Sequence, residues 1–165
     1  MLLAGTSVLA GPPAAESVLA AAAKAGKPGK KNILVVFHAS WCGWCRKLEA
    51  VLSSPSATEI LERHFEKAEL TVLERGEKQA LENAGAEELL TSIAGKDAGL
   101  PFTVVLERKS RRAIATSNLA GPGTNIGFPS KADEIDAFVT MLRMGAPRMT
   151  AAEAETIRAA FPPPK

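Results

Sequence analysis

An uninterrupted run of five apolar residues, Ile33 to Phe37, is rich in β-branched side chains. A short run of this kind predicts a strand that is buried on both faces. Leu48, Val51 and Leu52 follow at helical spacing, so the next segment is predicted to be a helix. Residues 38–47 therefore form a junction at which a central strand leads into a helix.

The pattern before this strand predicts one helix. Residues 14–25 are rich in alanine, which has the highest helix propensity, and Gly26 and Pro28 end the segment. We expect the apolar stripe of this helix to pack on the edge of the sheet.

After the junction, the pattern predicts a second helix and a second strand. Pro55 marks a break, and Ser56 and Glu59 have the spacing of a capping box for a helix that reaches about Lys67. Residues 68–73 then alternate apolar and polar positions, which predicts a strand.

The middle of the chain predicts short helices followed by a hairpin. Residues 74–99 are polar and helix-prone, with glycines as breaks, and predict two short helices. Strands predicted at residues 102–107 and 112–117 are joined by a charged turn, which indicates an antiparallel hairpin. Residues 118–130 contain several glycines and prolines and predict a loop.

Two helices complete the chain. Ser130 is expected to cap a helix whose apolar residues have helical spacing, at Ile135, Phe138, Val139 and Leu142. Thr150 begins a further short helix, which the prolines at 162–164 end. The order of elements predicts an α/β fold with a mixed central sheet and helices on both faces.

Composition narrows the class of protein. A chain of 165 residues with 46% hydrophobic and 23% charged residues suits one soluble globular domain. A net charge of +2 and the lack of tyrosine argue against a nucleic-acid-binding protein. No apolar run approaches the roughly 20 residues of a membrane-spanning helix. We expect a monomer that needs no cofactor and holds no metal.

The first residues are set apart from the predicted fold. Residues 1–15 resemble the apolar back half of a secretory signal peptide that lacks its basic front. A disordered tail is the alternative. In either case residues 1–13 are excluded from the fold, and the predicted domain covers residues 14–165.

The two cysteines of the chain, Cys42 and Cys45, both fall in the junction. A spacing of three places them on one face of a helical turn, within disulfide reach, so the pair can change between dithiol and disulfide with little backbone movement. Cys42 would lie at the helix N-terminus, where unpaired N–H groups and the helix dipole lower the pKa of a thiol. Cys45 would then be the resolving thiol.

Three alternatives for the pair are a structural disulfide, half of a zinc site and two inert buried thiols. A loop of two residues constrains the unfolded chain very little, which weakens the first. No second cysteine pair exists to complete a four-ligand zinc site. The position after a buried strand favours redox chemistry.

The residues around the pair resemble the thioredoxin-like family. Val-Val-Phe-His-Ala-Ser-Trp-Cys-Gly-Trp-Cys at residues 35–45 looks like the family's active-site strand and helix. Gly-Leu-Pro-Phe-Thr-Val-Val at residues 99–105 looks like its second landmark, a cis-proline that opens the next strand. The resemblance covers about residues 14–145, and it is closer to bacterial exported members with a Trp-Cys-Gly-Trp-Cys site than to thioredoxin itself.

This resemblance implies a thioredoxin-like three-layer sandwich and a thiol-disulfide oxidoreductase. Such a protein reduces or exchanges disulfides in protein substrates and is itself served by a redox partner protein. A periplasmic or secreted location follows from the exported members, with the cytoplasm as the alternative. The interval from Cys42 to Pro101 is longer than in a minimal thioredoxin, which implies an insertion around residues 74–99.

The resemblance also assigns supporting residues to the cysteine pair. Pro101 would lie in cis against the pair, and Leu100 would offer backbone groups to an extended substrate. Trp41, Gly43 and Trp44 complete the motif.

In one respect the chain departs from thioredoxins, which carry a buried acid in the strand where this chain has Val36. That acid is thought to take the proton of the resolving thiol. Glu49, one helical turn below Cys45, is a candidate for the same role, directly or through a water. The alternative is an exposed Glu49 that pairs with Arg46 or Ser53.

Two hypotheses from other classes stay open. The chain could be a thioredoxin-like binding module whose thiols do not turn over. It could also be a metallochaperone that binds copper(I) or zinc through Cys42, Cys45 and His38. His38 lies at the end of the predicted strand, where it is either a neighbour of the thiols or a polar strand-end residue.

Overall fold

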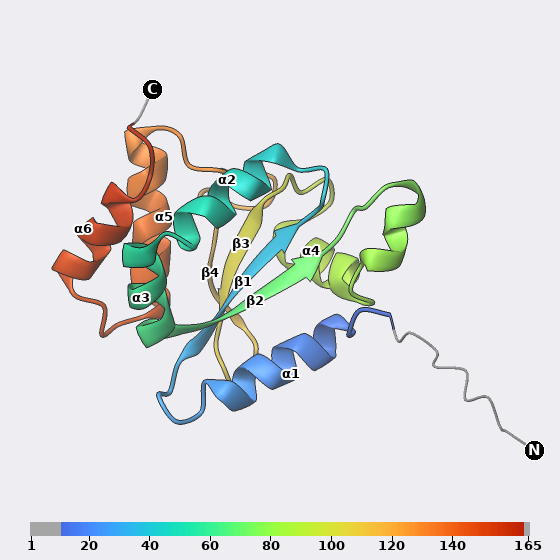
Figure 1. Cartoon of the computed structure of the whole chain (residues 1–165), viewed down its shortest axis with the longest axis horizontal. Coiled ribbons are helices and arrows are strands. Elements are labelled where there is room, and N and C mark those ends of the chain that lie inside the picture. Colours follow the sequence, from blue (N-terminus) through green and yellow to red (C-terminus); the bar gives the residue numbers. More distant parts are fainter. Residues whose placement is uncertain (1–10, 164–165) are drawn as a thin grey trace, which may run out of the picture.

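The computed structural model describes residues 11–163 and contains one mixed sheet of four strands in the order β2-β1-β3-β4 (Figure 1). The central strand β1 (Asn32–His38) runs parallel to β2 (Phe65–Thr71) and antiparallel to β3 (Phe102–Leu106). The last strand, β4 (Ala113–Thr116), pairs antiparallel with β3. The predicted central strand and hairpin are confirmed.

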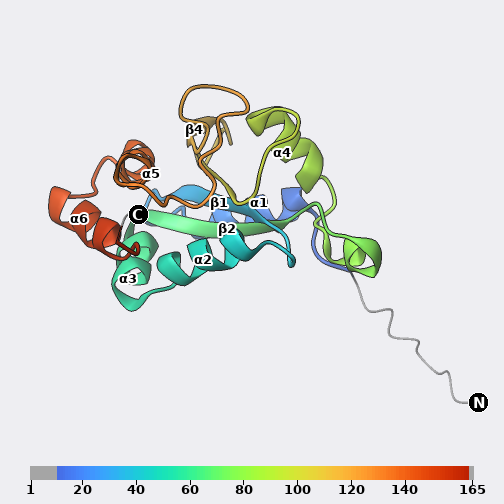
Figure 2. The ribbon, with the colours of Figure 1, turned by 90° about the horizontal axis from the view of Figure 1, so that it is seen from above.

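Helices cover both faces of the sheet, which confirms the predicted α/β architecture. One face carries α2 (Gly43–Leu52), α3 (Pro55–His64) and α5 (Ala132–Gly145), and α6 (Ala151–Ala159) packs onto α3 and α5. Figure 2 shows α2 and α3 following one another along the same side of β2. The opposite face carries α1 (Ala15–Ala25) and α4 (Ala86–Ala94).

The side chains of β1 alternate between the two faces of the sheet, which explains why helices cover both faces. Ile33, Val35 and Phe37 point to the α1 and α4 side, whereas Leu34 and Val36 point to the side of α2 and α5. All five are buried, so both faces of this strand are apolar. The cluster on the α1 side includes residues of both β1 and the edge strand β2, as expected for a helix near the edge of the sheet.

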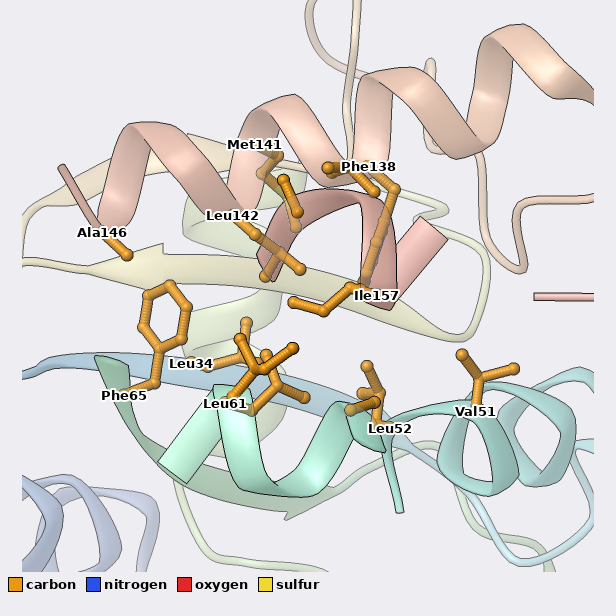
Figure 3. Close-up of a cluster of buried hydrophobic side chains, with 14 of the residues drawn as sticks. Leu34, Val51, Leu52, Leu61, Phe65, Phe138, Met141, Leu142, Ala146 and Ile157 are labelled. Atoms are coloured by element: carbon orange, nitrogen blue, oxygen red, sulfur yellow. The ribbon is translucent and has the colours of Figure 1, made fainter. Parts of the chain in front are cut away.

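The core on the α2 side joins four helices to the sheet. Figure 3 shows Leu52, Leu61, Phe138, Leu142 and Ile157 converging on β1 and β3. Each is almost fully buried, and burial of such a side chain stabilises the fold by about 1.5–3 kcal/mol. This packing fixes the position of α2, which carries the cysteines.

The end of α5 approaches β3 at van der Waals distance. A Cβ atom at Gly145 would lie 2.3 Å from Cγ1 of Val105, which is fully buried. The Asn32 side chain donates to the Gly145 carbonyl at 2.9 Å and accepts from the Arg108 N–H at 3.2 Å. The start of β1 is thereby tied both to α5 and to the end of β3.

The predicted boundary between the second helix and the second strand was wrong. The helix α3 begins at Pro55, with Ser54 as its N-cap, so Ser56 lies inside the first turn and forms no capping box. Proline is favoured at the first helical position because its fixed φ suits the helix and its missing N–H is not needed there. The helix ends at His64 rather than at Lys67, because Phe65 already pairs with β1.

Smaller differences concern helix starts. The N-cap of α5 is Lys131 rather than Ser130, and the Glu134 carboxylate accepts hydrogen bonds from the N–H groups of both. The predicted cap of the last helix is confirmed, since Thr150 and Glu153 form a capping box at α6.

The segment between β2 and β3 contains the 3₁₀ helix η1 (Gly76–Leu81) and α4, in agreement with two predicted short helices. That this segment is an insertion stays a prediction. No helix within residues 11–163 is both long enough and apolar enough to cross a membrane. The N-terminal segment set apart from the fold lies outside the described residues as far as residue 10.

Candidate active site

Cys42 and Cys45 lie at the start of α2, directly after the loop that follows β1. Cys42 is the N-cap residue, and Cys45 lies in the first turn. The two form a disulfide with their Cα atoms 5.2 Å apart. The Cys45 N–H donates to the Cys42 sulfur at 3.1 Å, so a backbone donor of the helix start faces this sulfur.

The oxidised pair is almost buried. Cys42 is 3% exposed and Cys45 is 5% exposed, and both pack against Ala39 and Leu100 in a small apolar cluster. The residues around the pair therefore control how another sulfur can approach Cys42.

The loop before β3 lies beside the pair. The Leu100–Pro101 peptide bond is cis, and Leu100 packs against the cysteines. Within residues 11–163, neither the N–H nor the carbonyl of Leu100 forms a hydrogen bond. These two backbone groups are therefore unpaired among the described residues.

Asn125 holds this loop in place, a role that the sequence did not indicate. Its side-chain nitrogen donates to the Gly99 carbonyl at 2.6 Å and to the Pro101 carbonyl at 3.0 Å. Its side-chain oxygen accepts from the Ser117 hydroxyl at 2.7 Å. The glycine-rich loop 118–130 thus supports the site through one asparagine.

Two exposed tryptophans flank Cys42 in the chain, Trp41 at 43% and Trp44 at 51% exposure. The Trp41 indole N–H donates to the Leu73 carbonyl at 2.7 Å. The Trp44 ring stacks on Phe128, with 5.7 Å between ring centroids. Both rings are held by the protein while much of their surface faces solvent.

A groove of about 480 Å³ opens beside Trp44. It lies between α2, the loop after β4 and the end of the chain, and its lining is mainly apolar, including Val51, Phe128, Pro129 and Pro162. Phe128, from the loop predicted at residues 118–130, is therefore part of the wall of this groove and also contacts Phe161.

Glu74 is a second residue whose importance the sequence did not reveal. It follows β2 and is only 4% exposed. Its carboxylate accepts hydrogen bonds from the Ser40 N–H at 2.5 Å and from the Ser40 hydroxyl at 2.8 Å. Ser40 stands two residues before Cys42, so this carboxylate fixes the loop that enters α2.

The charge of Glu74 is stabilised where it lies. Burial by itself raises the pKa of Glu74. The hydrogen bonds from Ser40 and the positive charge of Lys78 lower it by a larger amount, so the pKa lies below its ordinary value. A buried carboxylate is thus kept ionised beside the cysteine loop.

A hollow of about 470 Å³ reaches Cys45 from the side of β2. Val36, His38 and Glu49 are among its lining residues, so the candidate proton acceptor Glu49 and the strand-end His38 lie at the same hollow as Cys45. Val36 occupies the position at which thioredoxins have a buried acid, and here its side chain forms part of the wall.

Glu49 is engaged by other groups at the rim of this hollow. Lys67 donates to both carboxylate oxygens at 2.9 Å, and the Ser53 hydroxyl donates to one of them. Burial raises the pKa of Glu49, whereas hydrogen bonds involving Glu69, Ser53 and Lys67 lower it more. Of the two partners expected if Glu49 were a surface residue, Ser53 is present.

His38 and Gly43 have less specific surroundings. The His38 ring nitrogen Nε2 lies 3.3 Å from the Thr71 hydroxyl. A Cβ atom at Gly43 would meet only Arg46, at an ordinary 3.7 Å, so sterics do not require glycine there. Across residues 11–163 no three His, Cys, Asp or Glu side chains are arranged to hold a metal ion.

Comparison with known proteins gives a consistent result. A family model described as thioredoxin-like matches residues 14–107. Among solved structures, a disulphide isomerase from Xylella fastidiosa Temecula1 is 28% identical, with a TM-score of 0.50 over 62% of this chain and 72% of that one. No curated protein matches the chain significantly.

Two further solved structures are more distant. An oxidoreductase named DsbH is 21% identical, with a TM-score of 0.49 over 87% of this chain and 94% of that one. A thioredoxin from Thermus thermophilus is 20% identical, with a TM-score of 0.44 over 63% and 71% of the two chains.

Proposed function

This chain belongs to the thioredoxin-like family and is a thiol-disulfide oxidoreductase, and we propose that Cys42 is its attacking thiol and Cys45 its resolving thiol. The observation that carries the assignment is the position of Cys42 at the N-cap of α2, with a backbone N–H directed at its sulfur. Such a position stabilises a thiolate, and the thiolate is the nucleophile in disulfide exchange.

The reaction proceeds in two exchanges. The Cys42 thiolate attacks one sulfur of a substrate disulfide; that S–S bond breaks, a mixed disulfide forms, and the other substrate sulfur leaves as a thiolate. The Cys45 thiolate then attacks the Cys42 sulfur, which forms the Cys42–Cys45 disulfide and releases the second substrate thiolate. Two electrons pass to the substrate, and the reverse sequence donates a disulfide.

Protein substrates fit the surroundings of the pair. The unpaired backbone groups of Leu100 suit a segment that lies across the site in extended form. A segment bound to Leu100 would lie beside Cys42, because Leu100 packs against the cysteine pair. A separate redox partner protein returns the pair to its starting state after each turnover.

Thiol reactivity tests the assignment. Alkylation of the reduced protein at mildly acidic pH should modify Cys42 well before Cys45, as mapped by mass spectrometry of digested samples. Cys45→Ser should accumulate mixed disulfides with protein substrates, and Cys42→Ser should not. Equal alkylation rates at both positions would reject the assignment, and failure of the intact protein to reduce insulin would favour a binding module instead.

The hollow beside Cys45 is the route by which we expect its proton to leave. Cys45, Glu49 and His38 line it together, so a water in the hollow can connect the thiol to either group. The carboxylate of Glu49 accepts the proton through such a water and passes it on to solvent, because the hydrogen bonds from Ser53 and Lys67 lower its pKa and keep it from holding the proton.

Substitution of Glu49 tests this route. Glu49→Gln should slow the resolution of a Cys42 mixed disulfide about tenfold and leave the formation of that disulfide unchanged, as followed by rapid acid quench. Glu59→Gln is the matched control, because Glu59 is an exposed carboxylate of α3 that does not line the hollow. If the Glu49→Gln variant resolved the mixed disulfide at the wild-type rate, Glu49 would only pair with Lys67. If the His38→Gln variant then resolved it slowly, His38 would be the acceptor of the Cys45 proton.

The setting of the protein is proposed from its sequence. We expect the protein to work in the periplasm or outside a bacterial cell, because residues 1–15 resemble the apolar part of a signal peptide. We also expect it to be a monomer. Fractionation of a bacterium that makes the full chain, with sedimentation of the purified protein, tests both points.

A further inference from the structure

Four exposed basic side chains surround the start of α2, and together they are named here the cationic rim. They come from two segments that are distant in the sequence: Arg46 and Lys47 of α2, and Arg75 and Lys78 of the segment after β2. A chain with a net charge of only +2 thus gathers four positive charges around its cysteine pair.

Two of these cations are positioned by the loop before Cys42. The Arg46 guanidinium donates to the Ser40 carbonyl at 3.0 Å, and the Lys78 ammonium donates to the Ser40 hydroxyl at 3.2 Å. Ser40 stands two positions before Cys42 in the chain, so both cations are held by the loop that leads to the attacking sulfur.

The other two cations lie on the exposed tryptophans. The Lys47 ammonium stands 4.1 Å from the centroid of the Trp44 ring, and the Arg75 guanidinium stands 4.3 Å from that of Trp41. Cation–π contacts of this kind hold a long side chain in place without neutralising its charge.

Within residues 11–163 none of the four cations forms an ion pair, although the charge of Lys78 acts on the buried carboxylate of Glu74. No carboxylate of residues 11–163 lies within 4.0 Å of any of the four cations. Glu77 stands between Arg75 and Lys78 in the chain and still pairs with neither. The carboxylates of Glu74 and Glu49 accept hydrogen bonds from Ser40 and from Lys67, respectively.

From this charge pattern we infer that the cationic rim binds acidic side chains, and that the preferred partner is an extended protein segment with Asp or Glu next to its reactive cysteine. The inference rests on the proposed function, because it names the substrate class of the same site. Positive charge around a site attracts an anionic partner and raises the rate of encounter, and salt screens this effect.

Three peptide disulfides of equal length test the inference, with the cysteine flanked by acidic, neutral or basic residues. The rate constant for attack by the reduced full chain is measured by acid quench and chromatography, and each value is divided by the rate of the same peptide with dithiothreitol. This division removes differences in the intrinsic reactivity of the peptides. We expect a preference for the acidic over the basic peptide of about tenfold at low salt, shrinking to about twofold at high salt.

Variants assign the preference to the rim. Lys47→Gln and Arg75→Gln should each reduce the preference roughly two- to threefold. Lys24→Gln is the matched control, because Lys24 is an exposed lysine near the end of α1, which precedes β1, whereas Cys42 follows the far end of that strand (Figure 1). This control should keep the full preference.

The experiment distinguishes failure of the inferred preference for acidic partners from failure of the proposed function. Equal normalised rates for the three peptides, or a preference that survives in both rim variants, would overturn the inference. If the rim variants slowed all three peptides by the same factor, the cations would act on the Cys42 thiolate alone, which also overturns it. Failure of the reduced protein to react even with a small uncharged disulfide would instead overturn the proposed function.

Discussion

At the scale of single residues, Glu74 connects two parts of the chain that the sequence does not relate. A carboxylate that is 4% exposed accepts two hydrogen bonds from Ser40, and Ser40 in turn binds Arg46 and Lys78. The conformation of the loop before Cys42 therefore depends on a residue after β2. Glu74 acts as a positioning residue, since it touches the loop and not the sulfur.

Substitution at this position should change turnover. Glu74→Ala removes both acceptors and should lower kcat/KM for a protein disulfide roughly tenfold, because the entry to α2 loses its fixed geometry. Glu74→Gln retains one acceptor and should recover part of the rate. Gln79→Ala is the control, because Gln79 is an exposed and uncharged residue of the same segment, and a rate for Glu74→Ala equal to that of this control would show that Glu74 does not position the loop.

The site residues fall into two groups, those marked by a short motif in the sequence and those that reach the site only through long-range contacts. Cys42, Trp41 and Trp44 stand within one short motif, and Pro101 opens a recognisable apolar strand, so they could be proposed from sequence. Glu74 binds Ser40 across 34 positions, and Asn125 binds Gly99 across 26. Contacts between such distant residues depend on the complete fold, and no local spacing announces them.

At the scale of elements, the agreement of prediction with structure follows the strength of the periodicity. β1 and α2 were predictable because a continuous apolar run and a clear helical stripe have single interpretations. The boundary between α3 and β2 was misplaced because Leu61 and Phe65 are four residues apart, which also suits a helix. Pairing of Phe65 with Asn32 in the parallel sheet overrides that local pattern.

The contact between α5 and β3 gives a prediction about packing. Gly145→Ala should lower the free energy of unfolding by about 1–3 kcal/mol, because the new methyl group would overlap the buried and rigid Val105 side chain. Urea unfolding of the oxidised protein measures the change. Met144→Ala, at the exposed neighbouring position, should stay within about 0.5 kcal/mol of the wild type, and equal effects of both substitutions would contradict close packing at Gly145.

At the scale of the whole molecule, several carboxylates link stability to acidic pH. The Ser110 backbone N–H lowers the pKa of Glu107 to about 2, and the Thr150 N–H, with His64, lowers that of Glu153 to about 2. Because these groups bind protons less readily when folded, their contribution is complete above their ordinary pKa of 4.5 and is lost as the pH falls towards 2.

Acid titration of the fold checks this linkage. The urea midpoint of the oxidised protein should fall steadily between about pH 4.5 and pH 2, and Glu153→Gln should make that fall shallower. Glu155→Gln is the control, because Glu155 lies on the same helix and its contact with Arg158 is long, at 3.9 Å. This variant should keep the wild-type slope. A Glu153→Gln slope equal to that of wild type would show that the contacts of Glu153 with Thr150 and His64 do not carry the pH dependence.

The placement of the aromatic residues has a spectroscopic consequence. The chain has two tryptophans and no tyrosine, and in the sequence Trp41 stands one position before Cys42 and Trp44 two positions after it. Practically all near-ultraviolet absorbance and emission of the protein therefore originates within a few residues of one disulfide. The colourless dithiol–disulfide change has a built-in optical reporter, and the intrinsic fluorescence of the unlabelled molecule can follow its redox state in real time.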